Sequence, residues 1–270
     1  MISRTHAFGV LAGISLALYA VQSQAGGREE ARILTATQVL DELNATRDQA
    51  IPERLLERAY GIAVVPDVAK VAFFAGGRHG KGLLVVRDKN GHFTSPVFIR
   101  LSGGSIGWQA GVQQSDIVLV FTTRAGIEGI TDGKLTLGGD ASVAAGPVGR
   151  SASAGTDINF TAEVYSYSRA RGLFAGIALD GTAITIDRGA NANFYKRAEA
   201  SASDIINGTL TSNDAATQRF LAAITSSTAP ASSANAVTPT QPTTPAAAPP
   251  ASGGAQSYPM EDPQPGQEPK

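Results

Sequence analysis

Residues 62–86 read IAVVPDVAKVAFFAGGRHGKGLLVV, and this stretch decides the fold class. Two short apolar runs, IAVV and LLVV, stand at its ends, and a third, VAFF, stands in its middle. Runs of this length, bounded by glycine and proline, are typical of buried strands. Four more follow along the chain: PVFI, DIVLVF, FAGIAL and TAITI, at residues 96–99, 116–121, 174–179 and 182–186. The sequence therefore predicts a β-rich core between Ile62 and Asp187.

The segments between these runs indicate how the strands connect. Asn90-Gly91 and Asp180-Gly181 each lie between two apolar runs, where tight hairpin turns are expected. The segment GGRHGKG at residues 76–82 lies between the runs VAFF and LLVV, so it is also predicted to be a basic hairpin turn. A nucleotide-binding phosphate loop is the alternative, but such a loop would have to open a helix. Strands joined by hairpins favour a largely antiparallel sheet that is closed or folded over itself. The clearest alternation spans residues 158–168, which predicts a strand with one buried face.

Helical patterns flank this core on both sides. Ile33, Ala36, Leu40 and Leu43 recur at helical spacing, which predicts an amphipathic N-terminal helix. A short second helix is expected after Pro52. On the C-terminal side we expect a helical stretch at residues 194–207 and a last helix that begins at residue 213. The predicted fold class is therefore α+β: a largely antiparallel, closed or folded-over β-sheet core with amphipathic helices at the N- and C-terminal ends of the domain.

The two ends of the chain differ in composition from this domain. Residues 1–25 combine a basic start, an apolar run from Phe8 to Val21 and small residues before Gly26, which predicts a cleaved signal peptide. A transmembrane anchor is the alternative, but the run is shorter than the roughly 20 residues that cross a bilayer. Residues 226–270 are rich in Ser, Thr, Ala and Pro, so we expect a disordered tail. The folded domain is predicted at residues 26–225, in a periplasmic or secreted protein.

Composition limits the classes of function. The chain holds 22 Lys and Arg, 23 Asp and Glu, and no cysteine. This balance predicts no nucleic-acid binding, and any attraction to anionic groups must come from a local patch. Only His79 and His92 follow the predicted signal, so neither a metal site nor a nucleophile with its base is indicated. We therefore expect no catalytic residue, no metal and no cofactor.

Glycine is frequent in LSGGSIGWQAGVQ at residues 101–113 and in LGGDASVAAGPVGR at residues 137–150. Repeated glycine in strand-like runs indicates bends, bulges or the close approach of another backbone or a ligand. A tightly coiled sheet fits this pattern. A small-residue surface against which an acyl chain lies fits it as well, and the sequence leaves both open.

Four separated blocks carry a resemblance to a known family. They are GIAVVPDVAKVAFFAGG at residues 61–77, SPVFIRLSGGSIGWQAGVQQSDIVLVF at 95–121, LGGDASVAAGPVGR at 137–150 and YSYSRARGLFAGIALDG at 165–181. In this order they resemble the SYLF domain, also described as the yeast actin-patch lipid-binding domain, over about residues 34–224. The resemblance implies binding to membrane lipid, phosphoinositides in eukaryotic members, through an amphipathic N-terminal helix and nearby basic side chains. Some fungal members also bind actin, which an exported chain would not meet.

For a bacterial exported member, the resemblance implies an anionic phospholipid such as phosphatidylglycerol or cardiolipin. The expected function is non-enzymatic binding of anionic membrane lipid through peripheral membrane contact. An envelope scaffold with a protein partner is the alternative, and an enzyme ranks last. Whether lipid touches a surface patch or lies in an internal cavity stays open. The candidate lipid-binding residues are Arg54, Arg58, Lys70, Arg78, Lys81, Gly107 and Trp108.

Overall fold

The computed structural model describes residues 27–46, 51–72, 75–106, 111–131, 133–148 and 160–229. These residues all lie within one unit of the chain, Met1–Ser232. The predicted signal peptide and residues 230–270 of the predicted tail lie outside the described residues. The predicted domain boundaries therefore stay a prediction, although the last described helix continues three residues beyond 225.

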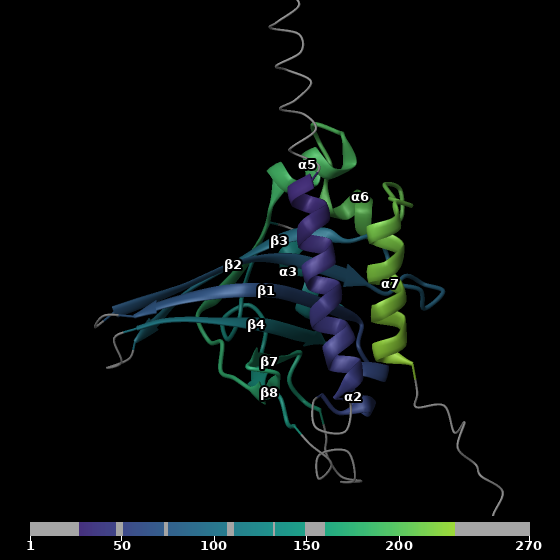
Figure 1. Ribbon diagram of the computed structural model, residues 1–270. Coiled ribbons are helices and arrows are strands. Elements are labelled where there is room, and N and C mark those ends of the chain that lie inside the picture. The colour runs from purple at the N-terminus through teal and green to yellow at the C-terminus, as the bar shows by residue number, and fades with distance from the viewer. Residues whose placement is uncertain are drawn as a thin grey trace, which may run out of the picture. The chain divides into compact units, whose positions relative to one another are not determined.

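Nine strands of the described chain form one curled, mostly antiparallel sheet, a half-barrel (Figure 1). Their order is β5-β9-β3-β2-β1-β4-β7-β6, and β8 pairs with β7. Only the β6–β7 pair is parallel among these strands. The strands are β1 (Gly61–Ala72), β2 (Ala75–Val86), β3 (Val97–Ile106), β4 (Gly111–Phe121), β5 (Lys134–Thr136), β6 (Val143–Ala145), β7 (Val164–Ala170), β8 (Leu173–Gly176) and β9 (Thr182–Ile186). Because this order has two ends, the described sheet is curled without being closed.

Six helices of the described chain pack around the sheet. The N-terminal helix covers residues 27–45 and is purple in Figure 1. The others are α2 (Glu53–Glu57), α3 (Ala125–Thr131), α5 (Arg188–Tyr195), α6 (Ala202–Ile206) and α7 (Ala215–Thr228). The last helix begins at Ala215 because the side chain of Asp214 caps it, accepting a hydrogen bond from the N–H of Thr217.

One face of the sheet is covered by the N-terminal helix and α7, which lie side by side (Figure 1). Ile33 and Leu40 of the N-terminal helix and Phe220 of α7 are fully buried there, against alternate residues of the central strands such as Val64 and Leu83. Each such side chain contributes about 1.5–3 kcal/mol when buried. This packing fixes both helices on the sheet.

The other face is covered by α3, α6 and the short strand β5. Its core contains the residues that alternate with those of the first face, among them Val65, Leu84 and Leu119, together with Ile127 and Ile130 of α3. The central strands are therefore apolar on both sides, which explains why their sequences are continuous apolar runs instead of alternating ones.

Two of the three predicted turns need correction. The segment at residues 76–82 is not a turn but lies inside β2, because Gly80 and Gly82 fit tightly against β1: a Cβ on Gly82 would stand 2.3 Å from the backbone oxygen of Val64. The Asp180-Gly181 turn joins β8 to β9, which pair with other strands and not with each other. The Asn90-Gly91 turn is present between the paired strands β2 and β3.

The predicted strand at 158–168 and helix at 194–207 also have other bounds in the structure, and residues 158–159 lie outside the described residues. The strand begins only at Val164, and both of its faces are buried, since Tyr165 and Tyr167 lie in one core and Val164 in the other. Two helices stand in place of the predicted one: α5 begins at Arg188, before the predicted start, and ends at Tyr195, where Lys196 takes the left-handed conformation, and α6 covers Ala202–Ile206. The alternating pattern at residues 158–168 predicted only one buried face, and this was wrong because helices cover both sides of the sheet.

Candidate functional site

Four strands continue beyond their neighbours at one end of the sheet. The β3–β9 pairing ends at Gly103, and the β4–β7 pairing begins only at Asp116. Past these points β1, β2, β3 and β4 pair only with one another, and Figure 1 shows them projecting from the helix-covered part. We call this region the four-stranded extension; it comprises residues 68–72, 75–80, 104–106 and 111–115.

A bulge in β1 marks the base of this extension. The pairing register of β1 shifts between Val65 and Val68, and Asp67 takes a positive φ of 51°. The N–H of Asp67 donates to the carboxylate of Asp116 at 3.0 Å, which fixes the bulge to β4. Bulges bend and twist a strand, so this one sets the direction in which the extension leaves the sheet.

The four-stranded extension carries two charged side chains, and both are positive. Lys70 and Arg78 face each other as cross-strand partners on β1 and β2, so their side chains share one face. No aspartate or glutamate occurs among the residues of the extension. Val71 also lies here and is 53% exposed. Val71 directly follows Lys70, so the extension carries two cations on one face and an exposed apolar side chain on the other.

Arg78 is held partly against the sheet. Its Nη1 donates to the carbonyl of Ala178 at a long 3.5 Å, and its buried Nε has no partner in the described structure. Burial lowers the pKa of Arg78 from its ordinary value, which is so high that the side chain stays charged. Lys70 is exposed. A loosely held guanidinium and an exposed ammonium can both turn toward an anion.

The other predicted lipid-binding residues do not join this pair. Lys81 lies three residues beyond Arg78 on the regular strand β2, so its side chain is on the opposite face, across from Arg100. Arg54 and Arg58 are exposed, but they precede the end of β1 that lies away from the extension. Gly107 and Trp108 lie outside the described residues. The structure therefore brings together two of the five described candidates.

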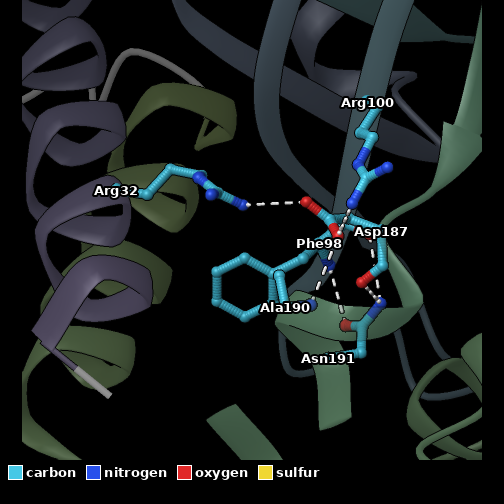
Figure 2. A network of polar contacts seen from close by, with 6 residues as sticks. All are labelled: Arg32, Phe98, Arg100, Asp187, Ala190 and Asn191. Carbon is cyan, nitrogen blue, oxygen red and sulfur yellow. Dashed lines mark hydrogen bonds and ion pairs between the residues drawn. The ribbon is translucent and has the colours of Figure 1, made fainter. Parts of the chain in front are cut away.

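A buried charge network joins the N-terminal helix to the sheet (Figure 2). Asp187 is 3% exposed and lies between Arg100 of β3, at 2.7 Å, and Arg32 of the N-terminal helix, at 3.6 Å. The Arg32 guanidinium also lies 5.5 Å from the centre of the Phe98 ring. Asp187 further caps α5 by accepting the N–H of Ala190 at 3.2 Å. One carboxylate therefore connects three elements.

Asn191 of α5 completes this network. Its side-chain oxygen accepts the N–H of Phe98 at 2.9 Å, and its amide nitrogen donates to the carbonyl of Phe98 at 3.1 Å. These bonds give the backbone N–H and carbonyl of Phe98 partners at the point where the pairing of β3 with β9 ends. Burial alone would raise the pKa of Asp187, but the bond from Arg100, the N–H of Ala190 and the charges of Arg100 and Arg32 together hold this pKa below its usual value.

A second ionic contact ties the other end of the N-terminal helix. Arg169 of β7 bonds to Asp116 of β4 at 2.6 Å and also to Glu42 of the helix. Sequence reasoning missed both networks. The position of Asp187 between a strand-like run and a helix is a recognisable cap signal. Its pairing with Arg32, 155 positions earlier, leaves no local signal.

No group of three or more His, Cys, Asp or Glu in the described part of the chain is placed to hold a metal ion. His79 and His92 are both exposed. Among the described helices, none is long and apolar enough to cross a membrane. The geometry instead offers a charged extension and a helix-covered core.

Comparison with known proteins points to one domain family. The family model Ysc84, described as Las17-binding protein actin regulator, matches residues 102–227. This match and the relatives below support a relationship of the chain to the Ysc84/SYLF domain family. LAS seventeen-binding protein 3 of Saccharomyces cerevisiae is 39% identical over 151 residues, covering 55% of this chain and 33% of the relative. Protein YSC84 of the same yeast is also 39% identical over 151 residues, 55% of this chain and 32% of the relative.

Vertebrate relatives match as well. SH3 domain-containing YSC84-like protein 1 of Xenopus laevis is 33% identical over 182 residues, covering 67% of this chain and 54% of the relative. The chain thus spans between a third and about half of the length of these relatives. Their names describe binding proteins and not enzymes.

Proposed function

We propose that this protein binds anionic membrane lipid without catalysis and that the four-stranded extension makes the contact. The observation that carries the proposal is the pairing of Lys70 with Arg78 on one face of a projecting region that has no carboxylate among its residues. Each Lys or Arg near an anionic bilayer contributes about 1 kcal/mol. If the extension enters the headgroup region with both faces, the exposed side chain of Val71 adds apolar contact from the face opposite to the two cations.

The compartment belongs to the proposal as well. The basic start, apolar run and small residues before Gly26 support export to the periplasm or medium. The lipid in that case is an envelope phospholipid such as phosphatidylglycerol. N-terminal sequencing of the mature protein tests this part alone: Gly26 at the amino end supports export, and Met1 retained contradicts it.

The lipid contact is tested by co-sedimentation with phosphatidylglycerol vesicles at low salt. The double variant Lys70→Glu and Arg78→Glu should bind more than about tenfold more weakly, because two attractive charges become repulsive. Lys196→Glu with Arg197→Glu makes the same charge change on exposed residues after α5 and serves as the control. Equal binding by both double variants would contradict a contact at the extension.

Protein binding is the second candidate function. One observation favours it: the outer edges of β3 at residues 104–106 and of β4 at 111–115 have no neighbouring strand in the described sheet. Such edges can accept a strand from a partner. The names of relatives, LAS seventeen-binding protein 3 and SH3 domain-containing YSC84-like protein 1, support a protein partner in the family. Absence of vesicle binding by the unmodified protein would favour this candidate, with an envelope protein as the partner.

A further inference from the structure

A row of residues with polar side chains crosses the base of the four-stranded extension. Lys70 of β1 is the direct cross-strand partner of Arg78 on β2 and of Gln113 on β4. Arg78 is also the partner of Gly103 on β3, which in turn pairs with Thr182 on β9. Direct partners in antiparallel strands point to the same side of a sheet. These five residues therefore form one line across five strands, and none of them is acidic.

Gly103 brings the hydroxyl of Thr182 next to Arg78 in this row. A Cβ on Gly103 would stand 2.8 Å from Oγ1 of Thr182 and 3.1 Å from its Cα, so the hydroxyl occupies the space that a side chain at residue 103 would fill. Thr182 has no exposed surface, and its Oγ1 has no hydrogen-bond partner in the described structure. A buried hydroxyl without a partner destabilises a fold, so stability alone does not account for this threonine.

Arg78 also has donors that the fold leaves unused. Its buried Nε has no partner among the described residues, and its Nη1 reaches only the carbonyl of Ala178, at 3.5 Å, which is longer than an ordinary N–H···O bond. Burial lowers the pKa of Arg78, and no carboxylate acts in the other direction. In the described part of the chain this half-buried cation therefore has no counter-ion, and a hydroxyl donor without a partner stands beside it.

We propose that a phosphate group binds over Gly103, where its oxygens accept hydrogen bonds from the guanidinium of Arg78 and the hydroxyl of Thr182. The guanidinium turns away from its long bond to Ala178 to admit the ligand, and the ammonium of Lys70 adds a second positive charge. The planar donors of arginine match phosphate oxygens, and hydrogen bonds to a charged group are the strong ones. The inference rests on the lipid contact proposed for the extension and names the group recognised there: the phosphate of a phospholipid headgroup, a chemistry that free phosphate esters share.

Isothermal titration calorimetry on the full chain tests this site with three soluble probes. These are dihexanoyl phosphatidylglycerol below its micelle concentration, inorganic phosphate, and hexanoate, which carries a charge and an apolar chain but no phosphate. We expect both phosphate probes to bind, and hexanoate to bind at least about tenfold more weakly than the phospholipid. The proposal is overturned if hexanoate binds as tightly as the phospholipid, or if neither phosphate probe binds.

Two variants then separate phosphate recognition from charge and from stability. Thr182→Val replaces the hydroxyl by a methyl group of similar size, so phospholipid binding should weaken by about tenfold while urea unfolding shows no loss of stability. Arg78→Lys keeps the charge but removes the planar donors, and it should also weaken binding by about tenfold. Thr185→Val is the matched control: it makes the same change on β9, on the opposite face of the strand, and should bind normally.

The outcomes distinguish this inference from the function on which it rests. If Thr182→Val and Arg78→Lys both bound the phospholipid as tightly as the unmodified protein, charge alone would account for the contact. The phosphate site would then be wrong, and the proposed lipid contact would stand. If the unmodified protein failed to co-sediment with phosphatidylglycerol vesicles, the proposed function would be wrong instead. Binding of inorganic phosphate that depends on Thr182 would in that case identify a site for free phosphate esters.

Discussion

The helix-covered half of the sheet and the four-stranded extension use the same strands in opposite ways. In the covered half, β1 and β2 are apolar on both faces and are enclosed by helices, as Val64 and Leu84 show with no exposed surface. In the extension, the same two strands carry glycine, alanine, an exposed valine and two cations. The first region has many buried partners to lose, and the second has few. Stability is therefore concentrated in one part, while the other is free to carry a binding surface.

The largest effect is expected in the covered half, at Asp187. Asp187→Ala removes the carboxylate that lies between Arg32 and Arg100, and the less exposed of the two cations, Arg32, then keeps only the weaker effect of the Glu29 charge. Breaking a buried ion pair costs about 3–5 kcal/mol, and the cap of α5 is lost as well. Urea unfolding should show this decrease in the free energy of unfolding.

Asp41→Ala is the matched control for that experiment. Asp41 lies 3.8 Å from Arg219 with about half of its side chain exposed. An exposed pair contributes about 0–1 kcal/mol. If Asp187→Ala lowered stability no more than Asp41→Ala, the buried network would not hold the N-terminal helix to the sheet.

The same carboxylate makes stability depend on pH. The pKa of Asp187 is lower in the folded protein than the value of about 3.9 in an unfolded chain. Its contribution is therefore fully present above about pH 5 and is lost as pH falls through the folded pKa. Asp187→Asn should remove this part of the acid-induced loss, so its free energy of unfolding should fall less between pH 5 and pH 2 than that of the unmodified protein. Identical pH slopes would contradict the assignment.

A pair of glycines compares the two regions directly. A Cβ on Gly82, in the covered half, would stand 2.3 Å from the backbone oxygen of Val64 and 2.7 Å from the Cα of Val65, neither of which can move alone. Gly82→Ala should therefore lower stability by about 1–3 kcal/mol. Gly104→Ala, in the extension, meets nothing within 4 Å and should change stability by about 0.5 kcal/mol or less. If both variants lowered the melting temperature equally, the two regions would not differ in how tightly they are packed.

Much of the covered half could be predicted from the sequence, because apolar runs and helical spacing report burial directly. The runs at residues 62–65, 83–86 and 116–121 all lie in central strands. The glycines at 76–82 were predicted as a turn because glycine marks turns and close packing equally well, and only the position of β1 against Gly82 distinguishes them. The strand predicted at 158–168 is found at 164–170, and its alternating pattern did not show that both faces are covered.

The site was harder to predict than the core. Lys70 and Arg78 were identified as basic residues, but their pairing depends on where the β1–β2 hairpin turns. Placing that turn at residues 76–82 put Arg78 and Lys81 together, whereas the strand register separates them onto opposite faces. The contact of Arg32 with Asp187 depends on how the N-terminal helix crosses the sheet, and no spacing in the sequence encodes that crossing.

The smallest effect on stability is expected at Val71, and it distinguishes surface function from core packing most sharply. Val71→Ser removes an apolar side chain that is 53% exposed, so the free energy of unfolding should change by about 0.5 kcal/mol or less. If the extension enters the headgroup region, the lost apolar contact should still weaken binding to phosphatidylglycerol vesicles by about three- to tenfold. Leu173→Ser is the matched control, because Leu173 is 69% exposed on β8, outside the extension. Stability measured by urea unfolding and binding measured by co-sedimentation should then diverge for Val71→Ser and stay unchanged together for Leu173→Ser. Equal loss of binding in both variants would mean that exposed apolar surface acts wherever it lies, and the extension would have no special part in the contact.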